Sequence, residues 1–274
     1  MKIKKRLVNL SITLGLWIFS ILFLYPIFMV VITSFKAKSE ANVLSIALPK
    51  EWLLENYKIV WEKGKIGNSL INSIEISVLS VILILSLAST LSYILVRRNT
   101  NLCKKINRLL TFGIIAPMAI LPTVQMLKII HIYGSRISLV FIYAALYLPF
   151  SAMLYSSFIK GIPKEIDEAA VMDGAKGFKL FLKVIFPILK PVTATTGILT
   201  FMWVWNDFQY PLYLLNSSSK WTLPLSVYNF YGQFSRSWNL VCADMVIVSI
   251  PIVLVYILAQ KYVIDGMTAG AVKG

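Results

Sequence analysis

The sequence predicts an all-α membrane protein. Of its 274 residues, 58% are hydrophobic and only 14% are charged, a composition outside the usual range of soluble domains. The apolar residues form continuous runs, several of them long enough to cross about 30 Å of hydrocarbon. These runs lack the period-2 alternation of a membrane β-barrel strand. A bundle of transmembrane helices is therefore expected.

Six membrane-spanning helices are predicted within a single transmembrane domain, 1–274. The first four runs are free of charge over most of their length, and an acid interrupts each of the last two, Asp207 and Asp244. A cleavable signal peptide is the alternative for the first run, but its length favours an anchor. The predicted spans are 7–35, 69–96, 109–128, 137–160, 191–215 and 241–262.

Prolines interrupt the third predicted span. Pro117 and Pro122 remove backbone donors at membrane depth, so this helix is expected to be kinked or broken. Such a break is tolerated only where protein or a water-filled cavity covers it. An ordinary kink and a hinge of a transport pathway both remain open.

Basic residues predict the orientation. With six spans and both termini in the cytoplasm, 17 of the 27 Lys and Arg residues lie inside, as the positive-inside rule requires. The net charge of +15 is then explained by topology and by contact with anionic lipid, so membrane lipid is an expected partner and nucleic acid is not. The loop 161–190 is cytoplasmic in this orientation.

The cytoplasmic loop 161–190 is predicted to hold two short helices. An acid-rich segment follows Pro163, which suits a first helical position, and Asp173-Gly174 breaks the first helix. Asp173 is expected to cap the second helix. The pair could form a lipid-facing belt or a docking site; acids in the first helix favour a basic protein partner over an anionic leaflet. The second helix, 176–186, carries an apolar stripe of Phe178, Phe181, Leu182 and Ile185.

Signatures of covalent chemistry are missing from the sequence. It has no G-x-x-x-x-G-K-[ST] phosphate loop, and one histidine with two scattered cysteines makes no zinc site. No serine stands beside a plausible base. We therefore expect no catalytic residue, metal or cofactor in this chain, and any ATP must bind to another subunit.

The segment "EAAVMDGAKGFKLFLKVIFP", 168–187, resembles the EAA motif of ABC-importer permeases. Together with "WNDFQYPL" at 205–212 and the ending "TAGAVKG", it is similar to the maltose-type carbohydrate-uptake family, in particular to the smaller, six-span permease subunit. The resemblance implies a type I ABC importer permease fold with a cytoplasmic coupling helix. The implied coupling residues are Glu168 for a charged contact, Ala169 and Ala170 for close approach, Gly174 for the turn, and Asp173 and Ala175 beside it.

The same resemblance implies the partners and the location. It implies a heterodimer with a second permease, two ATPase subunits that hold ATP and Mg, and an extracellular or periplasmic solute-binding protein, in a bacterial cell (inner) membrane. The cargo is expected to be a sugar or oligosaccharide. The alternatives are another solute, such as a polyamine or phosphonate, or an ion-coupled secondary transporter. The tail 269–274 either reaches the ATPase or is a frayed end.

A polar aromatic segment near the fifth span is a candidate for the substrate path. Trp205, Asn206, Asp207 and Tyr210 combine aromatic faces with amide and carboxylate groups, which suit the C–H faces and hydroxyls of a sugar. The alternative is an aromatic belt at the outer interface. Asp207 would then cap a helix or pair across subunits.

Overall fold

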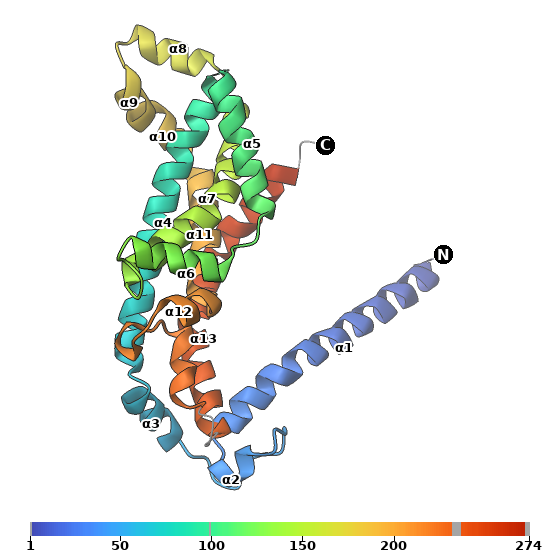
Figure 1. Ribbon diagram of the computed structural model, residues 1–274. Coiled ribbons are helices and arrows are strands. Elements are labelled where there is room, and N and C mark those ends of the chain that lie inside the picture. Colours follow the sequence, from blue (N-terminus) through green and yellow to red (C-terminus); the bar gives the residue numbers. More distant parts are fainter. Residues whose placement is uncertain (1, 99, 232–236, 272–274) are drawn as a thin grey trace. The chain divides into compact units, whose positions relative to one another are not determined.

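The computed structural model describes residues 2–98, 100–231 and 237–271, with backbone alone for 2–11, 259 and 261–271. Within these ranges the regular structure is helical, with no β-strand (Figure 1). The chain divides into two compact units. Unit 1 combines Met1–Gly67 with Ser226–Pro251, and unit 2 combines Asn68–Leu225 with Ile252–Gly274.

Unit 1 contains α1 (Lys2–Ser34), α2 (Lys38–Ala41), α3 (Glu55–Lys63) and the first part of α13 (Trp238–Ala271). Polar side chains hold these elements together. Asn56 on α3 donates to the backbone oxygen of Ser34 at 2.8 Å and accepts from Asn239 on α13 at 2.9 Å. The amide side chains of Asn56 and Asn239 thus join the end of α1, α3 and α13 by hydrogen bonds.

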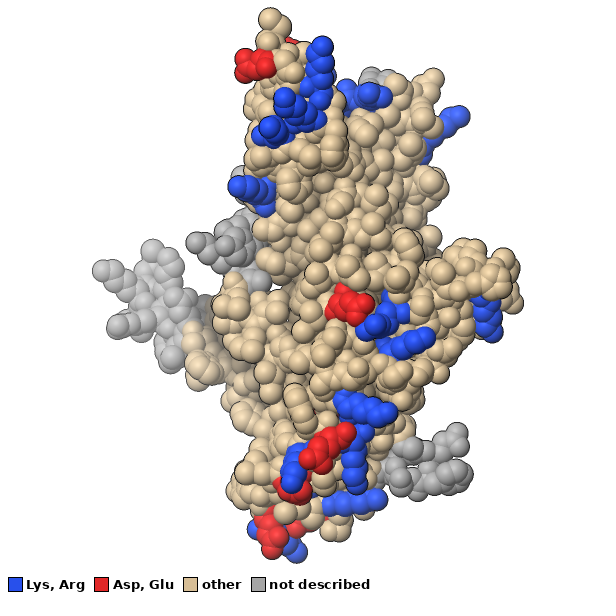
Figure 2. Space-filling view, turned by 90° about the vertical axis from the view of Figure 1, so that its left-hand side faces the viewer, with Lys and Arg blue, Asp and Glu red and all other residues tan. Residues whose placement is uncertain are grey.

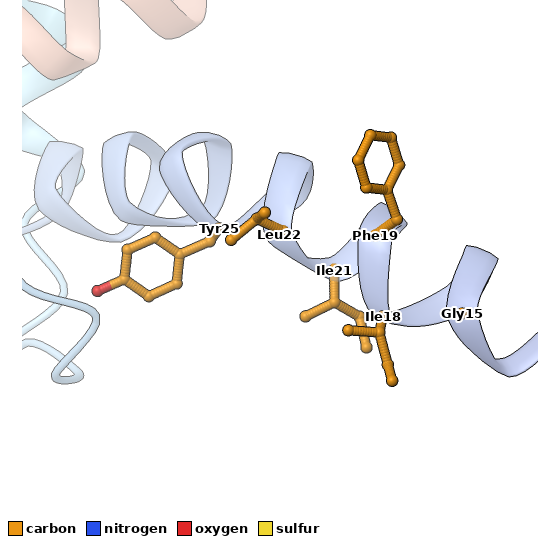
Figure 3. Close-up of a pocket in the computed structure, with 6 residues that line it drawn as sticks. All are labelled: Gly15, Ile18, Phe19, Ile21, Leu22 and Tyr25. Carbon is orange, nitrogen blue, oxygen red and sulfur yellow. The ribbon is translucent and has the colours of Figure 1, made fainter.

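From Ile12 to Val31, the helix α1 carries mainly apolar side chains on every side. None of the most apolar stretch within Ile12–Ser34 is buried. A helix that is hydrophobic all round is suited to lipid or to burial in an assembly. A shallow hollow lies along it, and because α1 alone supplies the lining, whose side chains Figure 3 shows as sticks, the hollow is open and not an enclosed site. The lining residues are Gly15, Ile18, Phe19, Ile21, Leu22 and Tyr25.

Unit 2 is built around long helices joined by close packing. Its bundle comprises α4 (Ile66–Arg97), α5 (Asn101–Ile115), α6 (Ile120–Ile129), α7 (Arg136–Lys160), α11 (Lys190–Asn206) and α12 (Gln209–Leu214). Small buried residues let membrane helices approach closely, and interhelical hydrogen bonds add to this. Ser92 donates to Ala152 at 2.9 Å, and Tyr155 donates to Thr193 at 2.8 Å. The small residues buried on α4 are Ser69, Ser73, Ser77, Ser80, Ala88, Ser89 and Ser92.

Four helices of the described chain are long and apolar enough to cross a membrane: α1, α4, α7 and α13. A fifth is counted if Gly177–Ile188 and α11, bent by 79°, form one span. With 17 residues, α11 alone is about 25 Å long, so it needs continuation through α12 to match the predicted fifth span. The count of six spans stays a prediction.

The predicted third span is two helices. α5 ends at Ile115, and Ala116 is extended with ψ of 118°, because the residue before a proline avoids the helical region. α6 begins at Ile120, so Pro122 lies in its first turn, where a missing amide hydrogen costs little. The break expected from the prolines is therefore produced by Pro117.

Candidate functional site

The helix α8 (Glu165–Met172) is the first helix of the loop 161–190, hereafter the EAA loop. Its first turn carries Glu165, Asp167 and Glu168, which interact favourably with the positive end of the helix dipole. The predicted helix is confirmed, with its start two residues after Pro163. Boundaries of this kind differ by one or two residues between assignments.

Gly174 ends α8 in the way the motif predicts. Its φ is +82°, a conformation that glycine adopts without a Cβ penalty. The amide of Ala175 donates to the oxygen of Ala170 at 2.9 Å, and that of Gly174 to Val171 at 3.0 Å. This pair of bonds is a Schellman motif, so Gly174 terminates the helix and turns the chain.

The prediction that Asp173 caps the second helix is wrong. It is the C-cap of α8, and Lys176, the N-cap of the next helix, makes no side-chain capping bond. The Schellman turn occupies the intervening residues. Asp173 therefore lies too far from the free amides of the second helix.

The second helix of the EAA loop comprises α9 (Gly177–Leu180), a π-helical turn (Phe181–Ile185) and α10 (Phe186–Ile188). The predicted apolar stripe is only half right, because the wider π turn changes which residues share a face. Phe181 and Ile185 are buried with Leu180, whereas Phe178 and Leu182 are exposed.

The two faces of α8 differ in character. Glu165, Glu168 and Ala169 are exposed. Ala170 is only 7% exposed and belongs to the hydrophobic core of unit 2. Its small side chain therefore serves the packing of α8 on its own bundle, which corrects the expectation that Ala170 permits approach of another subunit.

Three residues that sequence reasoning missed hold α8 to the bundle. Asp167 forms an ion pair with Arg97 at 2.7 Å and accepts a hydrogen bond from the Tyr93 hydroxyl at 2.6 Å. Tyr93 and Arg97 stand four residues apart at the end of α4, so both point from one helix face. In the sequence, the four-residue spacing of Tyr93 and Arg97 at the end of a span, together with the acids of the EAA loop, was the available signal for this contact.

Asp207 is a helix cap at the other end of α11. Its carboxylate accepts from the amide of Gln209 at 3.0 Å, from the amide of Tyr210 at 3.3 Å, and from the Tyr143 hydroxyl at 2.6 Å. The first turn of α12 and the middle of α7 thus meet at one carboxylate. Of the alternatives left open by the sequence, the geometry favours capping.

An aromatic row lies beside this carboxylate. Tyr143 stacks on Tyr147 with ring centroids 6.1 Å apart, Tyr147 contacts Trp203 at 5.2 Å, and Trp203 contacts Phe150 at 5.0 Å. Tyr210 packs edge-on against Tyr143 at 6.2 Å. Sequence reasoning missed Tyr143 and Tyr147, although their spacing places both on one face of α7.

Two of the predicted path residues are placed differently. Trp205 is only 4% exposed and stacks on Phe201 at 5.5 Å, so its indole faces the interior. Asn206 is exposed and donates to the backbone oxygen of Met202. Asp207 and Tyr210 are therefore in contact, whereas Trp205 packs against Phe201.

Replacing Asp207 with asparagine is expected to destabilise unit 2. The asparagine oxygen can still accept the amide hydrogen of Gln209, but its amide nitrogen cannot accept the Tyr210 amide and Tyr143 hydroxyl hydrogens that the second carboxylate oxygen binds, a loss of about 1–2 kcal/mol. The unfolding midpoint of the purified protein in detergent should fall by roughly 2–8 °C. The control is Asn206→Ala, which is exposed; an unchanged midpoint in Asp207→Asn would contradict the capping role.

Acids inside the predicted spans have partners, as the cost of burying a charge requires. Glu75 on α4 forms an ion pair with Arg136 at 2.6 Å, and Arg136 also donates to Asn72 at 2.7 Å. In unit 1, Asp244 is fully buried and accepts from Ser226 at 2.8 Å. Each of these acids therefore has a polar partner within the protein.

Comparison with known proteins identifies the family. Residues 100–269, more than half of the chain, match the family described as binding-protein-dependent transport system inner membrane component. The chain belongs to this family. It is thus a multi-pass membrane protein, and the matched region of this inner membrane component includes the EAA loop and the cap at Asp207.

Curated relatives of the inner membrane component are named as sugar permeases. This chain is 37% identical over 263 residues to the multiple sugar-binding transport system permease protein MsmG of Streptococcus mutans, and the match covers 92% of this chain and 93% of that protein. It is 35% identical over 252 residues to the melibiose/raffinose/stachyose import permease protein MelC of Bacillus subtilis, covering 91% of each. The probable starch degradation products transport system permease protein AmyC of Thermoanaerobacterium thermosulfurigenes is 33% identical over 258 residues, covering 93% and 94%.

A solved structure shows the same fold. The inner membrane component matches a chain of a bacterial ABC transporter involved in the import of the acidic polysaccharide alginate with a TM-score of 0.80. The match covers 94% of this chain and 96% of that chain at 23% identity. The predicted fold class, an all-α ABC importer permease fold, is therefore confirmed.

Proposed function

We propose that this chain is the membrane-spanning permease subunit of an ABC importer that takes up a sugar or oligosaccharide. ATP hydrolysis takes place in two separate ATPase subunits, which bind ATP and Mg, and this chain performs no covalent chemistry. The observation that carries the proposal is the EAA loop, a folded helix pair at one end of unit 2 (Figure 1) in a member of a binding-protein-dependent transport family.

The outer surface of the EAA loop supports an ATPase contact. Met172 is 87% exposed and Phe178 is 67% exposed, and large apolar side chains on a polar loop are typical of a protein interface. The exposed acids Glu165 and Glu168 suit a partner with basic residues and are repelled by an anionic leaflet. The acidic exposed face of α8 therefore fits a protein groove better than it fits lipid.

In Figure 2, basic side chains gather at the same end of unit 2, a band with few charges follows, and a further group of basic and acidic side chains lies beyond that band. This distribution supports a cytoplasmic EAA loop under the positive-inside rule. With six spans, we propose that both termini are cytoplasmic. The described part of the C-terminal tail, 269–271, continues α13, and 272–274 lie outside the described residues. The exposed lysines of the EAA loop and its ends are Lys160, Lys164, Lys176, Lys179, Lys183 and Lys190.

The sugar cargo is supported by the names of the relatives and by the aromatic row. Trp203 and Tyr147 are partly exposed, and aromatic faces stack on the C–H faces of sugars. Asp207 and Tyr210 adjoin this row. We propose that the row lines or gates the sugar path, together with a second permease.

The second permease of the proposed heterodimer is carried by the family and the relatives' names. The apolar side chains of α1 are exposed along the span, and such a surface is covered either by lipid or by a second permease. An external solute-binding protein delivers the sugar in this scheme. A crystal structure of the alginate transporter was solved with its periplasmic protein bound.

Reconstitution in lipid vesicles tests the proposal. The chain is purified with its partner permease, the ATPases and the binding protein, and uptake of labelled sugars is measured. Uptake should require ATP and the binding protein and should persist with a protonophore while ATP is maintained. Collapse under the protonophore would favour an ion-coupled secondary transporter. Uptake of a polyamine or phosphonate in place of any sugar would favour the other-solute alternative.

A further inference from the structure

We propose that Asp167, Arg97 and Tyr93 form a link that transmits movement of the EAA loop to the membrane span α4. The inference rests on the proposed function, because it assigns these three positioning residues a role in coupling the ATPases to the bundle. It extends the motif, whose matching residues include none of the three. The link lies entirely within unit 2.

Asp167 is the acid of α8 that faces the bundle. Glu165 and Glu168 in the same first turn are exposed, whereas Asp167 is partly buried. Both of its oxygens are engaged by the last turn of α4: Oδ1 by the Tyr93 hydroxyl at 2.6 Å, and Oδ2 by Arg97 Nη2 at 2.7 Å. One carboxylate thus joins the first helix of the EAA loop to a membrane span.

Arg97 also holds the segment that leads into α8. Its Nη1 and Nη2 both donate to the backbone oxygen of Ile162 at 3.2 Å. The guanidinium therefore contacts the loop at the chain before the helix and at the acid within it. A planar, charged fork of this kind fixes orientation as well as distance.

Tyr93 extends the link to the second helix of the EAA loop. Its ring lies 5.5 Å from that of Phe181, a buried residue of the π-helical turn. The last turn of α4 therefore contacts both helices of the loop. A displacement of either helix must move α4 or break these contacts.

The ion pair between Arg97 and Asp167 is largely shielded from solvent. The side chains of Arg97 and Asp167 are 13% and 17% exposed, so solvent screens the pair less than it screens an exposed pair. Removing one partner leaves the other charge partly buried without compensation, which is a large penalty. Exchange of the two charges, in contrast, preserves the pair.

A charge exchange in the assembled transporter tests the link. The variants are Asp167→Arg, Arg97→Asp and the double exchange, each purified with the partner permease and the ATPases. We expect each single variant to lose sugar uptake by at least about tenfold while ATP hydrolysis continues, because the loop still binds the ATPase but no longer moves α4. The double exchange should regain at least about a third of the uptake.

Two further variants separate coupling from folding. Arg98→Asp makes the same charge change at the next residue, which is exposed, and should retain nearly full uptake. Tyr93→Phe removes only a hydroxyl and should lower uptake by about threefold to tenfold, with a fall in the unfolding midpoint of no more than roughly 2–4 °C and with the complex still assembled.

Three results would overturn the link while leaving the proposed function intact. These are full uptake in both single variants, no recovery in the double exchange, or loss of uptake that exactly follows loss of complex assembly in every variant. Failure of the unmodified complex to take up sugar with ATP would overturn the proposed function itself. The two failures are therefore distinguishable in one set of preparations.

Discussion

Replacing Gly174 with valine is expected to abolish coupled transport. Gly174 has a φ of +82°, and a β-branched residue is strained there. A Cβ at this position would have no neighbour within 4 Å, so the cost is backbone strain, about 1–2 kcal/mol or more, and not a clash. The Schellman turn opens, the second helix of the EAA loop is displaced, and sugar uptake falls more than about tenfold.

The control for this prediction is Gly174→Asn. Asparagine adopts positive φ more readily than other side chains, so this variant should retain most of its uptake and its ATPase association. Equal losses in the valine and asparagine variants would show that glycine is needed for contact with the partner surface and not for its backbone conformation.

Replacing Glu168 with alanine should weaken the association with the ATPases. The side chain is exposed on α8, and a charge-assisted hydrogen bond is worth about 1.5–3 kcal/mol. That loss corresponds to roughly tenfold to hundredfold weaker binding. Co-purification of the ATPases with the permease, followed by sugar uptake, measures the effect.

Glu165→Ala is the matched control for Glu168→Ala. Both acids are exposed in the first turn of α8 and interact similarly with the helix dipole, so each replacement changes helix stability by a similar amount. Uptake in Glu165→Ala should stay near that of the unmodified chain. Similar losses in both variants would indicate a general effect on α8 in place of a specific contact at Glu168.

Much of the fold follows from the sequence because the bilayer makes long apolar runs unambiguous. The helices α1, α4, α7 and α13 come from such runs. The third and fifth spans were harder to predict, because single residues decide where their helices end. Pro117 ends α5 through the residue before it, and Asp207 separates α11 from α12. Run length carries no information about these breaks.

The candidate site was predictable where the backbone decides and not where packing decides. Gly174 was expected to turn the chain because only its backbone freedom matters, and its φ agrees. Ala170 and Trp205 were expected at functional surfaces but are buried. Their burial depends on neighbours distant in sequence. The contact between Asp167 and α4 likewise joins residues distant in sequence, and only the four-residue spacing of Tyr93 and Arg97 beside an acidic loop indicated it.

The short non-helical segments of the EAA loop also determine how far the loop can bend relative to the bundle. Between Arg136 and Asn206, the residues outside helices are 161–164, 173–176 and Leu189, and Leu189 is fully buried. A loop with so few non-helical residues has few backbone positions at which it can bend. If the proposed ATPase contact is made at α8, a displacement of α8 is expected to move α7 and α11 with it, because only these short segments could absorb it by bending.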